Sequence, residues 1–337
     1  MRRAAQGELR HLFAHFGNGE VLRYIFRSLL LLAVLSCGCR KAKEFQLDDE
    51  VKPVTERELM EMQKGDLERV DIARMNIICA RAAFQGKGPD IDACLRQIDV
   101  WAERVKKAET VYRKAFERNP ARYDNSYAKF RAVNLVLTIK EDFKCRYQRA
   151  LIESGAMNDV QSPRFFRNPD DVFITGLLRN RRGTCSSYPV LIASLGRRLG
   201  YPIYLKMSYG HLFCFWDDGV ERFNLDTNGE GVDTPSDGYY FSDPIHGLKG
   251  RTSDEMANDR VMVRLDNRDV LGVFLETAGY SLEAQRALPE AQGHYLAALR
   301  FRPKCLNLQR LAVRRVRVVP VQPIEGNNVL GAETKTH

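Results

Sequence analysis

The segment 183–226 constrains the fold most, because a helical pattern is followed at once by a hairpin pattern. Apolar residues at spacings of 3, 4 and 4 mark one face of a helix over 186–199: Tyr188, Leu191, Leu195 and Leu199. Gly200 supplies a stop for this helix, and Pro189 requires a start within the turn upstream. The helix therefore begins beside Cys185, where free N–H groups and the helix dipole favour a thiolate.

Three arginines directly before this cysteine favour the same ionised form: Arg179, Arg181 and Arg182. The alternative is a buried cysteine that behaves as a small hydrophobic residue. The position of Cys185 between Gly-Thr and Ser-Ser at a helix start favours the reactive interpretation.

Downstream, strand-forming runs around Asp218-Gly219 predict a β-hairpin that carries a histidine and an aspartate. A two-residue type I′ turn at Asp218-Gly219 sets a register in which His211 lies directly opposite Asp226. The β-carbons of such a pair are about 4.5–5.5 Å apart, within reach of a carboxylate–imidazole hydrogen bond. A slip of one residue would place the two side chains on opposite faces.

The same alternation predicts that Cys214 faces away from His211 and belongs to the core. Asn224 lies two residues before Asp226 on the same face and is the substitute for orienting the imidazole. The alternatives stay open: His211 is a hydrogen-bonded core or loop histidine, and Asp226 is a turn residue before Thr227.

These residues resemble the transglutaminase-like superfamily, whose core is papain-like. The matching motifs are Gly183-Thr184-Cys185, Leu199-Gly200-Tyr201-Pro202, His211 and Leu225-Asp226-Thr227. Over about 170–244 the sequence is similar to that of bacterial members that join this core to a tetratricopeptide-like tail. One departure is the interval of 26 residues from Cys185 to His211, which is shorter than in typical members. The resemblance implies an α+β fold, with a helix packed on an antiparallel sheet.

The C-terminal part supports the same resemblance. A tetratricopeptide-like spacing of 4, 3 and 5 joins four residues: Ala291, Tyr295, Ala298 and Pro303. Gly279 stands where such a unit closes its first helix. One helical pair cannot bury its own apolar face, so we expect the pair to pack on the core or on a partner. A generic helical hairpin is the alternative.

At the N-terminus, Arg23 and Arg27 precede the apolar run 29–35 and then Ser36-Cys37. This order resembles a bacterial lipoprotein signal peptide, with Cys37 as the lipidated residue and Cys39 as the weaker choice. The run of seven residues is far shorter than the roughly 20 that span a bilayer. We therefore expect an exported protein, lipid-anchored to a bacterial membrane on the envelope side. A short buried helix is the alternative.

The composition excludes several other classes. Five basic and two acidic residues precede Cys37, so removal of 1–36 lowers the net charge from +9 to +6. No nucleic-acid-binding motif accompanies this modest excess. The run Arg314-Arg315 favours a solvated basic face, and contact with anionic lipid, cell wall or an acidic substrate is the alternative. No CxxC pair, HExxH, Walker A or GxGxxG pattern occurs, so we expect neither a metal site nor a cofactor. Cys79 and Cys94 either cross-link or stay separate and buried.

The chain is predicted to divide into a signal peptide and five further segments. These are a linker (37–54), a helical region (55–155), the core (156–250), the helical hairpin (251–303) and a basic, partly disordered tail (304–337). Helices are expected from Thr55, over 92–116 and over 126–143, with a loop over 158–170. The turn-rich stretch 229–250, with Tyr239-Tyr240-Phe241 inside it, is expected to cover the cleft.

Two functions stay open. The first is a thiol enzyme, hydrolase or acyl transferase, that acts on peptide amide bonds through Cys185, His211 and Asp226. Its partner is a protein or peptide substrate, cell-wall peptide among the candidates. The second is an inactive transglutaminase-like interaction module anchored at the envelope. The intact set of three residues favours the first.

Overall fold

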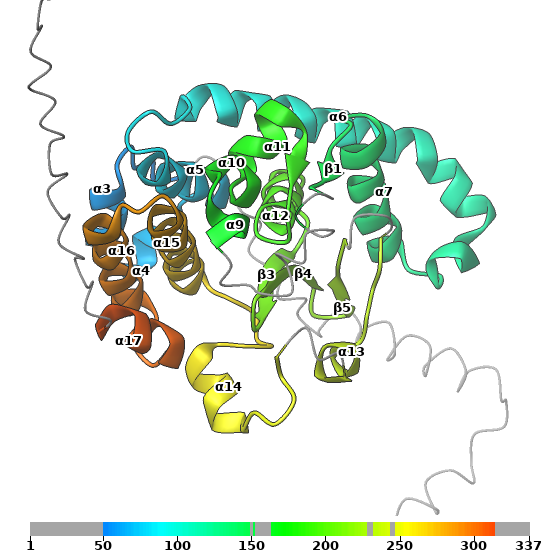
Figure 1. Cartoon of the computed structure of the whole chain (residues 1–337). Helices are drawn as coiled ribbons and strands as arrows, with labels where there is room; N and C mark the ends of the chain where they lie inside the picture. Colours follow the sequence, from blue (N-terminus) through cyan, green and yellow to red (C-terminus); the bar gives the residue numbers. More distant parts are fainter. Residues whose placement is uncertain (1–49, 149–150, 152–162, 228–231, 243–246, 314–337) are drawn as a thin grey trace, which may run out of the picture. The chain divides into compact units, whose positions relative to one another are not determined.

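The computed structural model describes residues 50–148, 151, 163–227, 232–242 and 247–313. Of these residues, 61% are helical and 10% lie in strands, which confirms the α+β class (Figure 1). The longer helices are α5 (Ile72–Ala83), α6 (Ile91–Arg118), α7 (Tyr127–Glu141), α12 (Tyr188–Arg198), α15 (Asn267–Ala284) and α16 (Leu288–Phe301). The shorter ones are α3 (Glu56–Glu61), α4 (Lys64–Leu67), η2 (Pro120–Tyr123), α9 (Pro163–Phe166), α10 (Pro169–Val172), α11 (Ile174–Asn180), α13 (Asp237–Ser242), α14 (Ser253–Asp259) and α17 (Leu306–Val313).

Helices begin where the sequence supplies a capping side chain. Thr55 Oγ1 accepts a hydrogen bond from the N–H of Glu58 at 3.2 Å, and Ser126 Oγ accepts one from Lys129 at 2.9 Å. Each such cap stabilises its helix by about 1 kcal/mol. The helix starts predicted at Thr55 and Ser126, and the helix predicted over 92–116, are confirmed.

The predicted loop over 158–170 contains two short helices, α9 and α10, so that prediction is wrong for its described part. Asn168 caps α10 by accepting from the N–H of Asp170 at 3.2 Å, and Pro169 stands in the first turn. A four-residue helix is too short to show an apolar period, which is why the pattern missed both.

Within the described ranges, five strands form two small sheets. β3 (Ile203–Ser208), β4 (His211–Asp217) and β5 (Arg222–Leu225) are antiparallel and lie in that order. β1 (Arg146–Tyr147) pairs in parallel with β2 (Arg182–Gly183).

The register of β4 and β5 differs from the predicted one by two residues. Asp217 pairs with Arg222, so the connection is the four-residue loop 218–221 and not a two-residue type I′ turn. Asp218 stabilises the longer loop, because its Oδ1 accepts from the N–H groups of Val220 at 2.8 Å and Glu221 at 2.7 Å.

The prediction that His211 lies directly opposite Asp226 is therefore wrong. In the observed register Cys214 pairs with Leu225, which makes Asp226 a diagonal neighbour of His211. A shift by two residues leaves every side chain on its predicted face, whereas a shift by one would not. His211 and Asp226 thus remain on one face, and Cys214 on the other.

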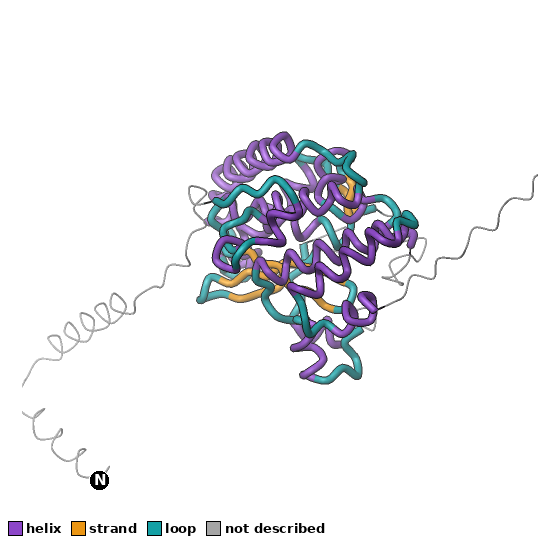
Figure 2. Tube along the Cα trace, turned by 90° about the vertical axis from the view of Figure 1, so that its left-hand side faces the viewer, coloured by secondary structure: helices purple, strands orange, loops and turns teal. Residues whose placement is uncertain are grey.

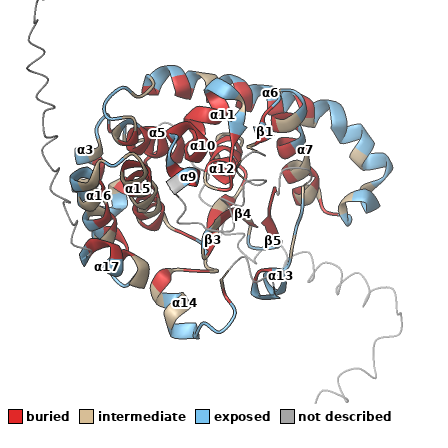
Figure 3. Cartoon of the chain, viewed as in Figure 1, coloured by how far each residue is buried: buried red, intermediate tan, exposed pale blue. Residues whose placement is uncertain are grey.

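Helix α12 lies at the centre of the apolar core. It contacts β3 and β4 on one side and α5, α6 and α7 on others (Figure 1). Figure 2 shows how few strands there are among the helices. Val190, Leu191 and Leu195 on this helix are completely buried. Figure 3 shows the contrast with α6, which is buried along one face and exposed along the other. The core therefore holds α12 rigidly against the sheet.

The range predicted as a helical hairpin contains α15 and α16, which pack against each other. A β-carbon at Gly279 would lie 2.5 Å from Cε1 of Tyr295, so only glycine allows this close approach. Helix α15 also packs on α5 and α9, which seats the hairpin on the core. Helix α17 was not predicted; it falls in the range expected to be a partly disordered tail.

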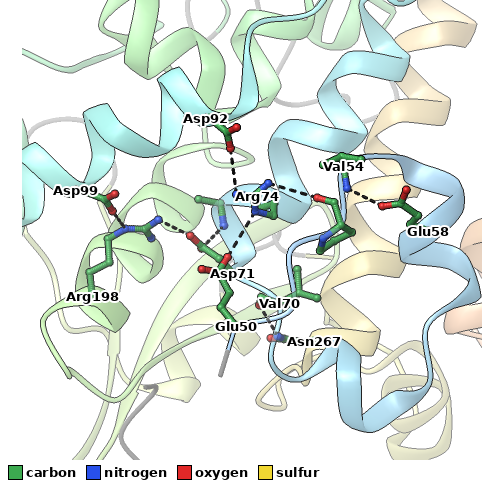
Figure 4. A network of polar contacts seen from close by, with 12 residues as sticks. Glu50, Val54, Glu58, Val70, Asp71, Arg74, Asp92, Asp99, Arg198 and Asn267 are labelled. Atoms are coloured by element: carbon green, nitrogen blue, oxygen red, sulfur yellow. Dashed lines mark hydrogen bonds and ion pairs between the residues drawn. The ribbon is translucent and has the colours of Figure 1, made fainter. Parts of the chain in front are cut away.

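A buried ionic network joins the start of α5 to the end of α12 (Figure 4). Asp71 caps α5 by accepting from the N–H of Ala73 at 2.8 Å, and its other oxygen accepts from Arg198. Arg198 Nε also donates to Asp99 of α6 at 2.6 Å. The side chains of Arg198 and Asp71 are only 6% and 4% exposed, so this is a fully desolvated pair.

The same network holds residues 50–54, which were predicted to belong to a linker. Arg74 of α5 lies 3.5 Å from the carboxylate of Glu50 and donates to the carbonyl of Pro53 at 3.4 Å. Val51 donates to the carbonyl of Arg69 at 3.3 Å. These residues therefore pack on the helical region.

Candidate active site

Cys185 lies in the turn that leads into α12. The N–H groups of Ser187 and Tyr188 both donate to the carbonyl of Thr184, at 3.1 and 3.0 Å, and this helical turn encloses the cysteine. A β-carbon at Gly183 would lie 2.5 Å from Ser187 Oγ, so the tight turn requires glycine there. The predicted place of Cys185 beside a helix N-terminus is confirmed, although α12 begins two residues later than expected.

His211 and Asp226 meet as the sequence predicted, through a different register. His211 Nε2 lies 2.7 Å from Oδ2 of Asp226. Asp226 follows the last residue of β5, and its backbone exchanges two hydrogen bonds with Asp233, at 2.9 and 3.0 Å. Its Oδ1 accepts from the N–H of Thr227 at 2.7 Å. These backbone contacts orient the carboxylate of Asp226 independently of its contact with the imidazole.

The thiol of Cys185 is close enough to the ring of His211 to raise its pKa through hydrogen bonding and charge. Because Nε2 is engaged by Asp226, Nδ1 is the ring nitrogen left for the sulfur. The imidazole therefore stands between a carboxylate and a thiol. Cys185 is 4% exposed and the side chain of His211 is 11% exposed, so water screens these contacts little.

The surroundings favour the charged form of the histidine. Burial alone would lower the pKa of His211, but hydrogen bonds and charges from Asp226 and Cys185 outweigh it and raise the pKa to about 10. For Asp226, burial acts to raise the pKa, but hydrogen bonds from His211, Tyr240 and the Thr227 backbone lower it below its ordinary value. An imidazolium held between two acidic groups follows from this balance.

Sequence reasoning missed Tyr147, whose hydroxyl is close enough to the Cys185 thiol for that thiol to raise its pKa. The parallel pairing of Tyr147 with Gly183 brings this tyrosine beside the thiol, and its ring stacks on Tyr188 with centroids 5.7 Å apart. Burial raises the pKa of Tyr147 well above its ordinary value, with Cys185 and Asp226 adding to the rise. The phenol is therefore a neutral O–H donor. A two-residue strand carries no periodic signal, so the sequence offered no sign of this contact.

Tyr240 is a second unexpected member of the site. It lies on α13, is completely buried, and donates from its hydroxyl to Oδ2 of Asp226 at 2.9 Å. Its neighbours Tyr239 and Phe241 are 38% and 42% exposed. The aromatic triplet was noticed in the sequence, but no pattern in it says which ring turns inward.

Asn224 does not take the predicted role of a substitute for orienting His211. Its Nδ2 donates to Asp237 at 2.8 Å and to the carbonyl of Pro235 at 2.9 Å. The diagonal register explains this, because Asn224 pairs with Phe215, four residues along β4 from His211. Cys214 faces the core as predicted, with its thiol 3.2 Å from the carbonyl of Pro189.

Two of the arginines predicted to act on Cys185 have other partners. The guanidinium of Arg181 lies over the ring of Trp101, 4.7 Å from its centroid. Arg179 forms an ion pair with Asp170 at 3.4 Å. These two arginines tie α11 to its neighbours.

The six cysteines within the described ranges are free and buried, Cys79 and Cys94 included. Burial raises the pKa of five of them, to about 12 in two cases: Cys79, Cys94, Cys145 (about 12), Cys214 and Cys305 (about 12). Those five thiols are therefore protonated at neutral pH. Cys79 adjoins the carboxylate of the Glu56–His294 pair, whereas the Cys185 thiol adjoins the histidine of its pair.

Other predictions fall outside the described part of the chain. These are the signal peptide over 1–36, Cys37 and Cys39, and Arg314-Arg315. Across the described ranges no helix is both long and apolar enough to cross a membrane. In the same residues no group of three or more His, Cys, Asp or Glu side chains is arranged to hold a metal ion.

Comparisons with protein-family models, with curated proteins and with solved structures found no match.

Proposed function

We propose that the chain is a thiol enzyme of transglutaminase-like type, with a papain-like core, that acts on peptide amide bonds by hydrolysis or acyl transfer. One observation carries this proposal. The ring of His211 lies between the carboxylate of Asp226, at 2.7 Å, and the thiol of Cys185. A nucleophile, a base and a group that orients the base are the parts that acyl transfer needs.

In the first step the proton of the Cys185 thiol already resides on Nδ1 of His211, as the imidazolium described above, and the sulfur attacks the amide carbon. The carbonyl π electrons move to oxygen, which becomes an oxyanion. Two donors are available to it: the backbone N–H of Cys185, which has no acceptor among the described residues, and the neutral phenol of Tyr147. Such donors commonly contribute about 10²–10³-fold to the rate.

In the second step the carbon–nitrogen bond breaks, and the imidazolium returns its proton to the leaving amine. A thioester on Cys185 remains. Water or an acceptor amine, deprotonated by His211, then attacks the thioester carbon. The carbon–sulfur bond breaks, the sulfur leaves with the bonding electrons, and the proton on His211 restores the imidazolium. Asp226 stays ionised throughout and stabilises the imidazolium.

The test joins labelling to turnover. Native protein is treated with a mild electrophile and the modified cysteine is identified, with His211→Ala as the matched variant. Protein that has not been treated with the electrophile is then incubated with peptides. Released amine and incorporation of a fluorescent primary amine are both measured, which separates hydrolysis from transfer. Labelling of Cys185 that depends on His211, together with either product, supports the enzyme.

A second candidate is an interaction module that has lost turnover. The observation in its favour is that Cys185 is only 4% exposed, with Tyr147 on its sulfur. Labelling that requires unfolding, and a Cys185→Ala variant that keeps its biological role, would establish this candidate instead.

We further propose that the protein is exported and lipidated at Cys37, because a charged segment and a short apolar run precede that residue. Metabolic labelling with a fatty-acid analogue should mark the wild type and not Cys37→Ser. Cys39→Ser is the matched control and should keep the label. Equal labelling of Cys37→Ser, or none in the wild type, would contradict lipidation at this residue.

A further inference from the structure

Helix α13 lies over the face of the sheet that carries the candidate active site, and Tyr240 is its buried anchor. The Tyr240 ring stacks on Phe213 of β4, with centroids 4.2 Å apart and planes at 12°. Both rings belong to a small apolar cluster with Leu248 and Val261. The ring therefore has a packing role, which leaves the contact of its hydroxyl to be explained separately.

That hydroxyl donates to the same atom that His211 uses. Oδ2 of Asp226 lies 2.9 Å from the Tyr240 oxygen and 2.7 Å from Nε2 of His211. Oδ1 meanwhile accepts from the Thr227 backbone at 2.7 Å. A carboxylate with three donors cannot rotate freely, and the oxygen that faces the imidazole shares its charge between two of them.

The start of α13 is held by a buried lysine. Lys206 of β3 donates from Nζ to Oδ1 of Asp237, the first residue of α13, at 2.7 Å. The lysine side chain is 5% exposed, and burying an ammonium group is costly without a partner. Asn224 completes the cluster, since it donates to Asp237 at 2.8 Å and lies 3.3 Å from the lysine Nζ.

Lys206, Asn224 and His211 all lie on one face of the sheet, as their register positions require. Asp237 and Tyr240 are three residues apart on α13 and so share one side of this helix. An unbroken series of contacts therefore runs from the buried lysine through α13 to Asp226 and the imidazole.

We propose that Tyr240 is a positioning residue for His211, acting through Asp226, and that the ion pair between the buried Lys206 and Asp237 holds it there. This inference rests on the proposed function, because it assigns the series of contacts to the Cys185–His211 pair. It explains why a lysine and an asparagine are buried on a sheet face outside the main core.

The variant that tests it is Tyr240→Phe, which keeps the ring on Phe213 and removes only the hydroxyl. The readouts are the titration of the His211 imidazole by NMR and the rate of Cys185 alkylation across pH. We expect the midpoint of the His211 titration to rise by about half a unit or more, because Asp226 then shares its charge with one donor fewer. The alkylation rate near pH 7 should fall about threefold to tenfold as the carboxylate loses its fixed orientation.

Tyr295→Phe is the matched control. Tyr295 is also buried and donates to a carboxylate, Glu283, at 2.5 Å, but it lies on α16. It should change neither readout. Lys206→Met should move both readouts in the same direction as Tyr240→Phe, and the double variant should add little. If Lys206→Met does not fold, Asp237→Asn tests the same ion pair. The Asp237 side chain is 54% exposed, so its substitution disturbs the packing less.

An unchanged His211 titration in Tyr240→Phe would overturn the inference, as would equal effects in Tyr295→Phe. The proposed function fails in a different way. It fails if His211→Ala leaves Cys185 alkylation unchanged, whereas the coupling of Tyr240 to the His211 titration is measured without any substrate or thiol reaction.

Discussion

Helix α12 has a buried polar network at each end, and the two networks differ in the chemical group that terminates them. At the C-terminal end, Arg198 joins Asp71 and Asp99, so each charge meets a charge of opposite sign (Figure 4). Before the N-terminal end, Asp226 and His211 form a similar pair that ends on the Cys185 thiol. Burial and pairing are common to both, so they do not mark an active site. The nucleophile at the end of one network is what distinguishes it.

The largest effect expected at the C-terminal network is on stability. Arg198→Met leaves Asp71 buried without its guanidinium, and we expect the free energy of unfolding to fall by about 3–5 kcal/mol. Urea unfolding measures this change. The alkylation rate of native Cys185 should stay within about twofold, because distant sites act independently. Arg57→Met, at a site whose side chain is 83% exposed, is the control and should leave stability unchanged. A large loss of Cys185 reactivity in Arg198→Met would mean that the two networks are coupled.

At the other end the main effect is on reactivity. His211→Ala should slow the alkylation of Cys185 at pH 6 by about tenfold or more, because the neighbouring imidazolium stabilises the thiolate. His294→Ala is a matched control, since His294 is also paired with a carboxylate, Glu56 at 3.1 Å, and is remote in sequence. Rates are followed by mass spectrometry of the cysteine peptides. Similar slowing in both variants would remove the distinction between the two networks.

The pH dependence of stability sharpens the comparison further. The pKa of His211 is raised from 6.5 to about 10, so its pairing stabilises the fold fully below pH 6.5 and is lost as the pH rises through 10. The wild type should therefore lose several degrees of Tm between pH 7 and 10. Asp226→Asn should show a shallower decline, because the carboxylate that raises this pKa is gone. Identical slopes in the two proteins would contradict the assignment.

The smallest effect is expected on the far face of the sheet. Cys214 lies three residues from His211 on β4 but points into the core, so Cys214→Ala should leave the Cys185 rate within about twofold. The cost in stability should be about 1 kcal/mol. A change in Cys185 reactivity here would show that the two faces of the sheet are not independent. The rate and the urea midpoint are measured on the same preparation.

Prediction from sequence succeeded where a local rule decides the outcome. Cys185 stands at a helix start because Pro189 and Gly200 limit where that helix begins and ends. His211 and Asp226 share a face because alternation along a strand has a period of two. The turn was predicted wrongly, because Asp218 accepts hydrogen bonds from backbone groups on the far side of its own loop. The resulting error in register is two residues, so His211 and Asp226 still lie on the predicted face of the sheet.

Where a contact joins segments that are distant in the chain, prediction from sequence failed. Tyr147 and Tyr240 both reach the site from short elements, β1 and α13, that show no period. Asn224 was expected to touch His211 and instead holds α13. None of these contacts follows from spacing, because each depends on how a neighbouring element lies over the sheet.

The sequence by itself determined the order of nucleophile, base and carboxylate, and the face on which each lies, because these follow from helix and strand periods and from Gly and Pro. Only the tertiary structure decided that the imidazole sits between the thiol of Cys185 and the carboxylate of Asp226, and which tyrosines donate to them. The physical reason is that hydrogen bonds between distant segments require positions within a few tenths of an ångström. Packing of α12 and α13 on the sheet, together with the pairing of β1 with β2, sets those positions.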